Sequence, residues 1–393
     1  MKNLSILLLV ISLMGGACQN KHQNNVLDLE IIVADIEKAK EEVDVSFLVD
    51  PNSAEIVILE TNQECLIGEV TKVHIREDKI LVYDELTTSV FVFNKDGSYH
   101  SKIHALGQGP GEYPPVVNDM VILKDKVGVL LPVLNKIMFY DFEGKYIGAV
   151  SLQNTWGSTF FTFDDLKYFI VNDWSDSKQG NYHIFTLETG KTKVERLLPF
   201  SKDKRVHRGW GLENYYSLYQ NRALILFSTE DVIYEILQDE KEINPRYQID
   251  IPKRKLPKSF CIGDGRTALQ TAIAEKYLTG ANQIMETSQY IILDISNTFR
   301  VIYDKLKKET VTTSEMFVIP EFGDFPVFLS TSHAMMENDR LINVHSPEMI
   351  RHVYPFDEKT IKNQNFAEKY LEMVNKLSDD DNPVLIIYNV NEK

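Results

Sequence analysis

Short apolar runs separated by polar turns fill this chain from Ser46 onward, and they recur in groups of three. The first complete group has runs at residues 80–83, 90–93 and 99–103, and the next group repeats this order, so that VFVFNKDGSY aligns with IMFYDFEGKY. The NKDG step is typical of a hairpin turn, because glycine tolerates the positive φ that such turns need. A unit of three short strands that recurs at intervals of roughly 40 to 65 residues predicts the blades of a β-propeller.

A linear stack of such units would leave an apolar face exposed at each end, and closure into a ring removes both ends. About six units fit into the length of the chain. Residues 54–60 (AEIVILE) and 383–390 (PVLIIYNV) are strands that belong to no complete unit, one near each end of the chain. We therefore predict an all-β fold, a six-bladed β-propeller over residues 45–393, closed by pairing of these N- and C-terminal strands.

Two segments depart from the strand pattern and predict short helical insertions. Residues 265–278 (GRTALQTAIAEKYL) form the first of them. In residues 365–377 the apolar side chains recur at helical spacing, which predicts an amphipathic helix packed on the outside or an end of the ring. These side chains are Phe366, Tyr370, Leu371, Val374 and Leu377.

The chain begins MKNLSILLLVISLMGGACQN, with a lysine, an apolar run and small residues before a cysteine. The apolar run is too short to span a bilayer, so residues 1–17 are predicted to be a signal peptide. The GGAC step resembles a bacterial lipobox, which implies that Cys18 is acylated; a plain secreted protein is the alternative. Residues 18–44 are then a lipid-anchor tether and N-terminal segment. The other two cysteines, Cys65 and Cys261, are expected as a disulfide, as two free thiols or as one of each.

The formal net charge of −15 argues against nucleic acid as a partner. Nucleic-acid binding depends on clustered positive charge that displaces counterions, and this chain has only short basic runs. Contact with a membrane is expected through the lipid anchor only.

Residues 107–113 read GQGPGEY, an unusual run of glycine and proline. A P-loop would need a lysine after its last glycine, and a dinucleotide fingerprint would need a helix to follow, so neither phosphate motif fits. We predict a structural corner that connects the outer strand of one blade to the inner strand of the next; a ligand-contacting loop is the alternative. The residues concerned are Gly107, Gly109, Pro110, Gly111, Glu112 and Tyr113.

The order of these features resembles that of the six-bladed β-propeller lipoproteins of Bacteroidota, which are related in architecture to NHL-repeat propellers. The resemblance runs from ECLIGEVTKVHIREDKILVYD through VFVFNKDGSYHSKI and GQGPGEY to NPVLIIYNV, and its most specific part is the GxGPGEY motif. It implies a fold and an envelope location, and no settled activity. The stretch QNKHQNN lacks the acidic residues that tend to accompany surface export in this group, so the periplasmic side is favoured over the cell surface.

Loops rich in aromatic and basic residues are candidates for ligand binding, because such side chains stack on sugars or hold peptides. Packing between blades is the alternative role for them. The candidates are Trp156, Trp174, His207, Arg208, Trp210 and Tyr215.

Catalytic motifs of the GxSxG and HExxH kinds are absent from the sequence, so no catalytic residue and no cofactor is predicted. Lactonase-type propellers hold a divalent cation with carboxylate and asparagine side chains from several inner strands, and a few residues here could be read that way. Ordinary turn residues are the alternative interpretation. These residues are Asn118, Asp119, Asn172, Asp173, Asp294 and Asn343.

We therefore expect a non-catalytic binding or scaffold module that holds a protein, peptide or glycan at the central face of the ring. The alternative is a metal-dependent hydrolase or lyase of the lactonase-like propeller type.

Overall fold

A computed structural model describes residues 29–172, 180–200, 215–227, 230–240, 242–257, 260, 265–323, 325–329, 334–337, 339–353 and 360–391. Its strands form six sheets. The first sheet in chain order consists of β4 (Val70–Arg76), β5 (Lys79–Asp84), β6 (Ser89–Asn94) and β7 (Tyr99–Ile103). The second consists of β8 (Asp119–Ile122), β9 (Val127–Leu131), β10 (Lys136–Tyr140) and β11 (Tyr146–Ser151). The third consists of β12 (Thr159–Thr162), β13 (Lys167–Val171), β14 (Tyr182–Glu188) and β15 (Val194–Pro199).

The other three sheets include strands from the amino end of the chain. The fourth sheet consists of β16 (Tyr216–Tyr219), β17 (Arg222–Ile225), β18 (Val232–Leu237) and β19 (Ile243–Asp250) with β1 (Glu30–Val33). The fifth consists of β20 (Ala281–Glu286), β21 (Tyr290–Ile295), β22 (Phe299–Asp304) and β23 (Glu309–Val318) with β2 (Lys40–Asp44) and β24 (Pro326–Val327). The sixth consists of β25 (Ala334–Glu337), β26 (Arg340–His345) and β27 (Val384–Asn389) with β3 (Glu55–Ile58).

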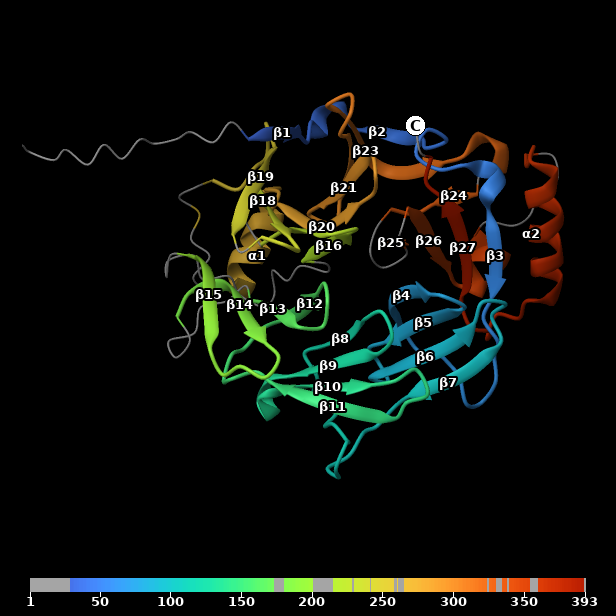
Figure 1. The fold of residues 1–393 in the computed structure, drawn as a ribbon. Coiled ribbons are helices and arrows are strands. Elements are labelled where there is room, and N and C mark those ends of the chain that lie inside the picture. Colours follow the sequence, from blue (N-terminus) through green and yellow to red (C-terminus); the bar gives the residue numbers. More distant parts are fainter. Residues whose placement is uncertain are drawn as a thin grey trace, which may run out of the picture.

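The sheets stand face to face around a common centre, which makes the fold an all-β propeller (Figure 1). The apolar core lies between neighbouring sheets, where Leu81 and Val90 of one sheet pack with Met120 and Val129 of the next. Strands such as β5 and β6 bury both of their faces and therefore lack a polar side in the sequence. The first strand of each sheet in the order above, namely β4, β8, β12, β16, β20 and β25, faces the middle of the ring (Figure 1).

The predicted pairing of the two terminal strands is confirmed. β3 pairs antiparallel with β27, with Val57 opposite Leu385 and Ile56 opposite Ile386. The strand near the start of the chain and the strand near its end thus complete a single sheet, which ties the two ends of the ring together.

Residues 30–58 form a segment that we call the outer strap, because its strands join the outer edges of three successive sheets. β1 pairs in parallel with β19, β2 pairs in parallel with β23, and β3 then pairs with β27. The described strands therefore begin at Glu30, ahead of residue 45, where the propeller was predicted to start. Open sheet edges offer unpaired N–H and C=O groups, so a short strand can add to them without an apolar pattern, and Ile31 indeed remains 56% exposed.

Both helical insertions are confirmed as α1 (Gly265–Ala274) and α2 (Gln364–Lys376). Asn363 caps α2, because its side chain accepts a hydrogen bond from the Phe366 N–H at 3.0 Å. Met373 takes the buried place predicted for Leu371, which is 38% exposed. None of the helices in the described parts of the chain is long and apolar enough to cross a membrane. The short helical turns are η1 (Ile36–Lys38), η2 (Pro51–Ser53), η3 (Pro132–Leu134), η5 (Pro320–Phe322) and the π-helical η6 (Met349–Val353).

Cys65 is a free, buried thiol, so it is not part of a disulfide. Its Sγ donates a hydrogen bond to the Glu60 carbonyl oxygen at 3.1 Å, and burial raises the pKa of the thiol. Cys261, Cys18 and the signal peptide lie outside the described residues.

Candidate functional site

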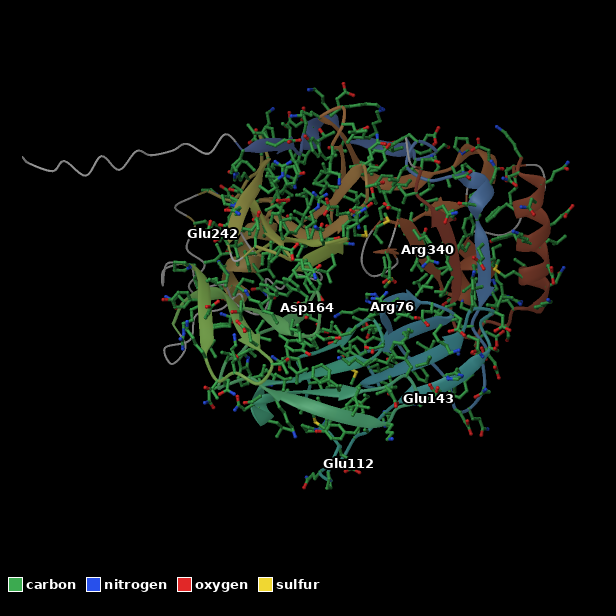
Figure 2. All side chains as sticks on the ribbon, in the orientation of Figure 1. Arg76, Glu112, Glu143, Asp164, Glu242 and Arg340 are labelled. Atoms are coloured by element: carbon green, nitrogen blue, oxygen red, sulfur yellow. The ribbon has the colours of Figure 1, made fainter. Side chains whose placement is uncertain are left out.

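Three basic side chains line one side of the inner strand β4. Lys72, His74 and Arg76 occupy alternate positions, while Val73 and Ile75 between them are buried in the core. Side chains alternate in direction along a strand, so the three basic groups share one side of it. Figure 2 shows Arg76 in the middle of the ring, near Arg340.

The first of these groups joins three neighbouring inner strands. Lys72 Nζ donates to Asp119 Oδ1 on β8 at 2.6 Å, and Thr159 on β12 donates its hydroxyl to Asp119 Oδ2 at 2.5 Å. The Asp119 carboxylate is therefore neutralised by Lys72 at one oxygen and held by the Thr159 hydroxyl at the other.

Arg76 connects β4 to the sheets on both sides. Its guanidinium donates to the carbonyl oxygens of Ile122 at 3.4 Å and Leu123 at 3.1 Å, and it forms an ion pair with Glu337 on β25. The Glu337 carboxylate also accepts the Ile75 N–H at 2.7 Å. Burial is the main cause that lowers the pKa of Arg76 to about 10, and the nearby charge of Arg340 contributes to this shift, but the group stays cationic at neutral pH.

His74 lies between these charges as a neutral imidazole. Its Nδ1 is 3.4 Å from Glu337 Oε1 and 3.4 Å from Arg76 Nη2. Burial holds the pKa of His74 well below its usual value, and the charges of Arg76 and Lys72 act in the same direction. The His74 imidazole therefore makes the site more polar without adding charge.

Arg340 begins β26 and lies opposite Glu337 in the β25–β26 hairpin. Within the described parts of the chain it forms no ion pair, because the Glu337 carboxylate is directed to Arg76 instead. We call Lys72, His74, Arg76, Asp119, Thr159, Glu337 and Arg340 the central cluster. It contains three cationic side chains and two carboxylates, so it is locally positive in a chain whose net charge is −15.

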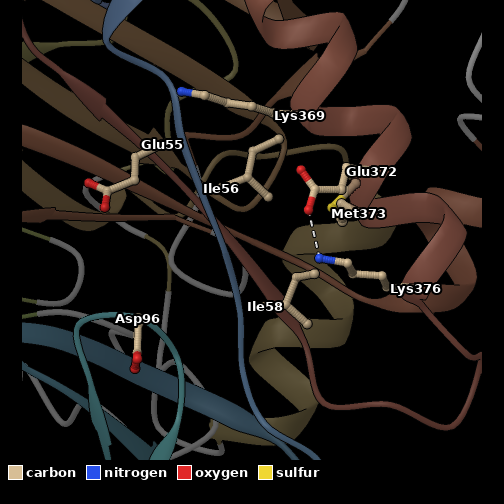
Figure 3. A pocket seen from close by; sticks show the side chains of 8 residues that line it. All are labelled: Glu55, Ile56, Ile58, Asp96, Lys369, Glu372, Met373 and Lys376. Atoms are coloured by element: carbon tan, nitrogen blue, oxygen red, sulfur yellow. Dashed lines mark hydrogen bonds and ion pairs between the residues drawn. The ribbon is translucent and has the colours of Figure 1, made fainter.

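A cavity of about 350 Å³ lies elsewhere, outside the ring, between β3 and α2 (Figure 3). Ile56, Ile58 and Met373 line it together with charged side chains. Several of these charges have partners in the protein: Lys376 forms an ion pair with Glu372 at 2.7 Å, and Lys369 Nζ donates to the Ala54 carbonyl oxygen at 3.3 Å. The central cluster differs because its Arg340 guanidinium has no ion-pair partner among the residues that the structure describes.

The described candidates for a metal site are spread over four sheets and have contacts of their own. Asp119 belongs to the central cluster, and Asp294 forms an ion pair with Arg300 at 3.3 Å. Among the residues that the structure describes, no group of three or more His, Cys, Asp or Glu side chains is arranged to hold a metal ion. Asp173 lies outside those residues. The asparagines hold backbone groups instead: Asn118 binds Gly157, Asn172 binds Tyr182 and Asn343 binds Phe328.

Only two of the six aromatic and basic candidates lie in the described regions. Tyr215 is half-buried and packs against the apolar cores on both sides of its sheet, as the packing alternative requires. Trp156 is half-buried in the loop before β12. The others, Trp174, His207, Arg208 and Trp210, lie outside the described residues.

The GQGPGEY segment connects β7 to β8, where the corner was predicted. Tyr113 is fully buried, donates its hydroxyl to the Thr88 carbonyl oxygen at 3.1 Å, and meets the Tyr140 ring edge to face at 5.7 Å between centroids. Tyr140 in turn donates its hydroxyl to the Gly111 carbonyl oxygen at 2.8 Å.

The glycines of this corner are needed for both space and backbone geometry. Gly111 has φ +82°, and a Cβ at Gly107 would overlap the Glu112 carboxylate, which accepts the Gly109 N–H at 2.7 Å. The exposed Pro110 lies between them. Figure 2 places Glu112 at the outer rim of the molecule, far from Arg76 and Arg340, which supports a structural corner rather than a central ligand loop.

The sequence reasoning singled out Asp119 but missed its partners. The available signal was KVHIR in β4, in which polar residues alternate where neighbouring strands are apolar on both faces. Glu337 and Arg340 carry no such signal, because their relation to β4 depends on closure of the ring.

The stacked sheets and the polar residues on their inner strands define a β-propeller. Residues 30–389 match the model of a domain of unknown function, DUF4934, and the chain belongs to this family. The match begins at the residue where the outer strap begins. No functionally curated protein matches the sequence.

Comparison with solved structures finds similarity at low sequence identity. A Bacteroides fragilis protein that its name describes as exported is 16% identical, with a TM-score of 0.68 over 92% of this chain and 100% of the other. A Bacteroides vulgatus member of the family DUF4221 is 12% identical, with a TM-score of 0.49 over 88% of this chain and 100% of the other. Virginiamycin B lyase from Staphylococcus aureus is 10% identical, with a TM-score of 0.42 over 85% of this chain and 98% of the other.

Proposed function

We propose that this protein is an exported, lipid-anchored, six-bladed propeller that acts as a binding or scaffold module on the periplasmic side of the cell envelope. Each of the six sheets would be one blade, with the outer strap and β27 completing the last three. Residues 1–17 would be removed as a signal peptide, and Cys18 would carry the lipid, followed by a short tether that ends where β1 begins at Glu30.

The central cluster is the observation that supports a binding role. It gathers charged side chains from β4, β8 and β25 at the middle of the ring. Such a set suits the recognition of a polar ligand, because a few positioned polar groups fix the orientation of whatever binds there. The ligand would be a protein, peptide or glycan at the central face.

Binding to an array of envelope glycans and a peptide library tests this proposal. The expected result is a ligand whose binding falls in Arg340→Ala and persists in Glu112→Gln, which removes a charge from the outer corner. The choice of Arg340 limits damage to the fold, since this side chain forms no ion pair with the described residues. A ligand that depends on Glu112 and not on Arg340 would place the site at the corner instead.

Metal analysis of the purified protein tests the competing hydrolase or lyase. Stoichiometric metal, or a cation-dependent rise in melting temperature that EDTA reverses, would contradict the non-catalytic proposal. An unchanged melting temperature with added divalent cations is the result that we expect.

A further inference from the structure

We propose that Arg340, beside Arg76, binds a carboxylate group of the ligand at the centre of the ring; this inference rests on the binding role proposed above. The Arg340 guanidinium has no ion-pair partner in the described parts of the chain. The register of the β25–β26 hairpin places Glu337 directly opposite Arg340, and residues paired in this way lie on the same face of a sheet. The Glu337 carboxylate is nevertheless occupied by Arg76 and the Ile75 N–H.

The guanidinium groups of Arg340 and Arg76 repel each other. Arg340 is close enough to Arg76 for its charge to oppose the charge of Arg76, and both lie in the middle of the ring in Figure 2. Arg76 cannot move away, because its donors are held by the carbonyl oxygens of Ile122 and Leu123. A bound anion would relieve this repulsion, so the free protein is arranged for an anionic group.

The chemistry of a guanidinium favours a carboxylate as this anionic group. A guanidinium presents parallel N–H donors that match the two oxygens of a carboxylate. The other cation of the central cluster, Lys72, is already neutralised by Asp119, and His74 is held neutral. One additional negative charge therefore completes the cluster, which favours a carboxylate over a doubly charged phosphate.

Two sources could supply a carboxylate, an acidic sugar or an acidic amino acid, and calorimetric titration of the full chain distinguishes them. The probes are glucuronate and N-acetylaspartate amide, each with its neutral counterpart, glucose and N-acetylasparagine amide. We expect one of the acidic probes to bind and its neutral counterpart to bind about tenfold more weakly, as the loss of a charged hydrogen bond implies. Arg340→Gln should weaken binding of the acidic probe by about the same factor.

The matched control is Arg196→Gln, which removes the same charge from an exposed position on the outer strand β15 and should leave binding unchanged. Without a ligand, Arg340→Gln should melt at the same temperature as the wild type or higher, because it removes the repulsion with Arg76. A marked fall in that melting temperature would show that Arg340 is structural and would overturn the inference.

Equal binding of the acidic and neutral probes, equal binding by Arg340→Gln and wild type, or no binding of either acid would each also overturn it. The proposed function would survive these results if the glycan and peptide arrays still found a neutral ligand that depends on the central face. A failure of the arrays would remove the proposed function itself.

Discussion

Gly111 shows at the scale of one residue how the corner between β7 and β8 depends on its glycines. Gly111 and Gly190 share a left-handed backbone, with φ of +82° and +76°. An added Cβ would crowd the Tyr146 side chain at 3.0 Å in Gly111, whereas at Gly190 it would meet nothing within 4 Å. Comparing alanine substitutions at Gly111 and Gly190 therefore separates the cost of the left-handed backbone from the cost of steric crowding.

We expect Gly190→Ala to lower the free energy of unfolding by about 1 kcal/mol, the cost of a left-handed alanine. Gly111→Ala should lower it by about 2 to 3 kcal/mol, because crowding adds to that cost. Urea denaturation measures both values. Equal losses at the two positions would mean that the corner has room to adapt.

His74 makes stability depend on pH. Its pKa is held well below the unfolded value of about 6.5, so the unfolded state binds a proton that the folded state refuses. This contribution is fully present above the unfolded pKa and is lost progressively as the pH falls from about 6.5 toward the lower folded pKa. The charged groups near the His74 imidazole are Lys72, Arg76, Asp119 and Glu337.

The expected result is a melting temperature that falls more steeply between pH 8 and pH 5 in the wild type than in His74→Gln. His100→Gln, which alters a histidine paired with Glu143 on the outer side of the ring, serves as the control and should follow the wild type. Parallel curves for the wild type and His74→Gln would show that the pKa of His74 is the same in the folded and unfolded states.

At the scale of elements, the closing strand β27 joins β26 to β3 and so completes the last sheet of the ring. Ile386 on β27 is fully buried and belongs to the largest apolar core, whereas Leu371 on α2 is 38% exposed. Ile386→Ala should lower the free energy of unfolding by about 2 to 5 kcal/mol, and Leu371→Ala by less than about 1 kcal/mol.

Chemical denaturation followed by tryptophan fluorescence and by circular dichroism checks this prediction. Coincident transitions would show that loss of the closing strand unfolds the whole ring. A small effect of Ile386→Ala would mean that the ring holds without β27.

The elements that could be predicted are those whose own residues carry an apolar pattern. The hairpins around NKDG, the strands β3 and β27, and α2 all do. β1 and β2 could not be predicted, because they add to open edges through backbone groups, and β2 buries only Val43. The pairing of Arg76 with Glu337 could not be predicted from the sequence either, because it joins strands from opposite ends of the chain across the point of closure.

At the scale of the whole molecule, the proposed anchor determines where the propeller sits. Cys18→Ala should move the protein from the membrane fraction to the soluble fraction, because a lipid chain is its only expected membrane contact. Cell fractionation and labelling with a clickable fatty acid measure this change. Cys65→Ala keeps the anchor and serves as the control, since Cys65 is buried. Lipid labelling that survives in Cys18→Ala would contradict the anchor.

The outer strap also has a mechanical consequence. A pull on the amino end would load the hydrogen bonds between β1 and β19 first, then those between β2 and β23, and only afterwards the closing sheet of β3 and β27. Two short strands can therefore peel away and lengthen the chain while the ring stays shut. The strap would therefore take up tension by successive unpairing of β1 and β2 before that tension reaches the blades.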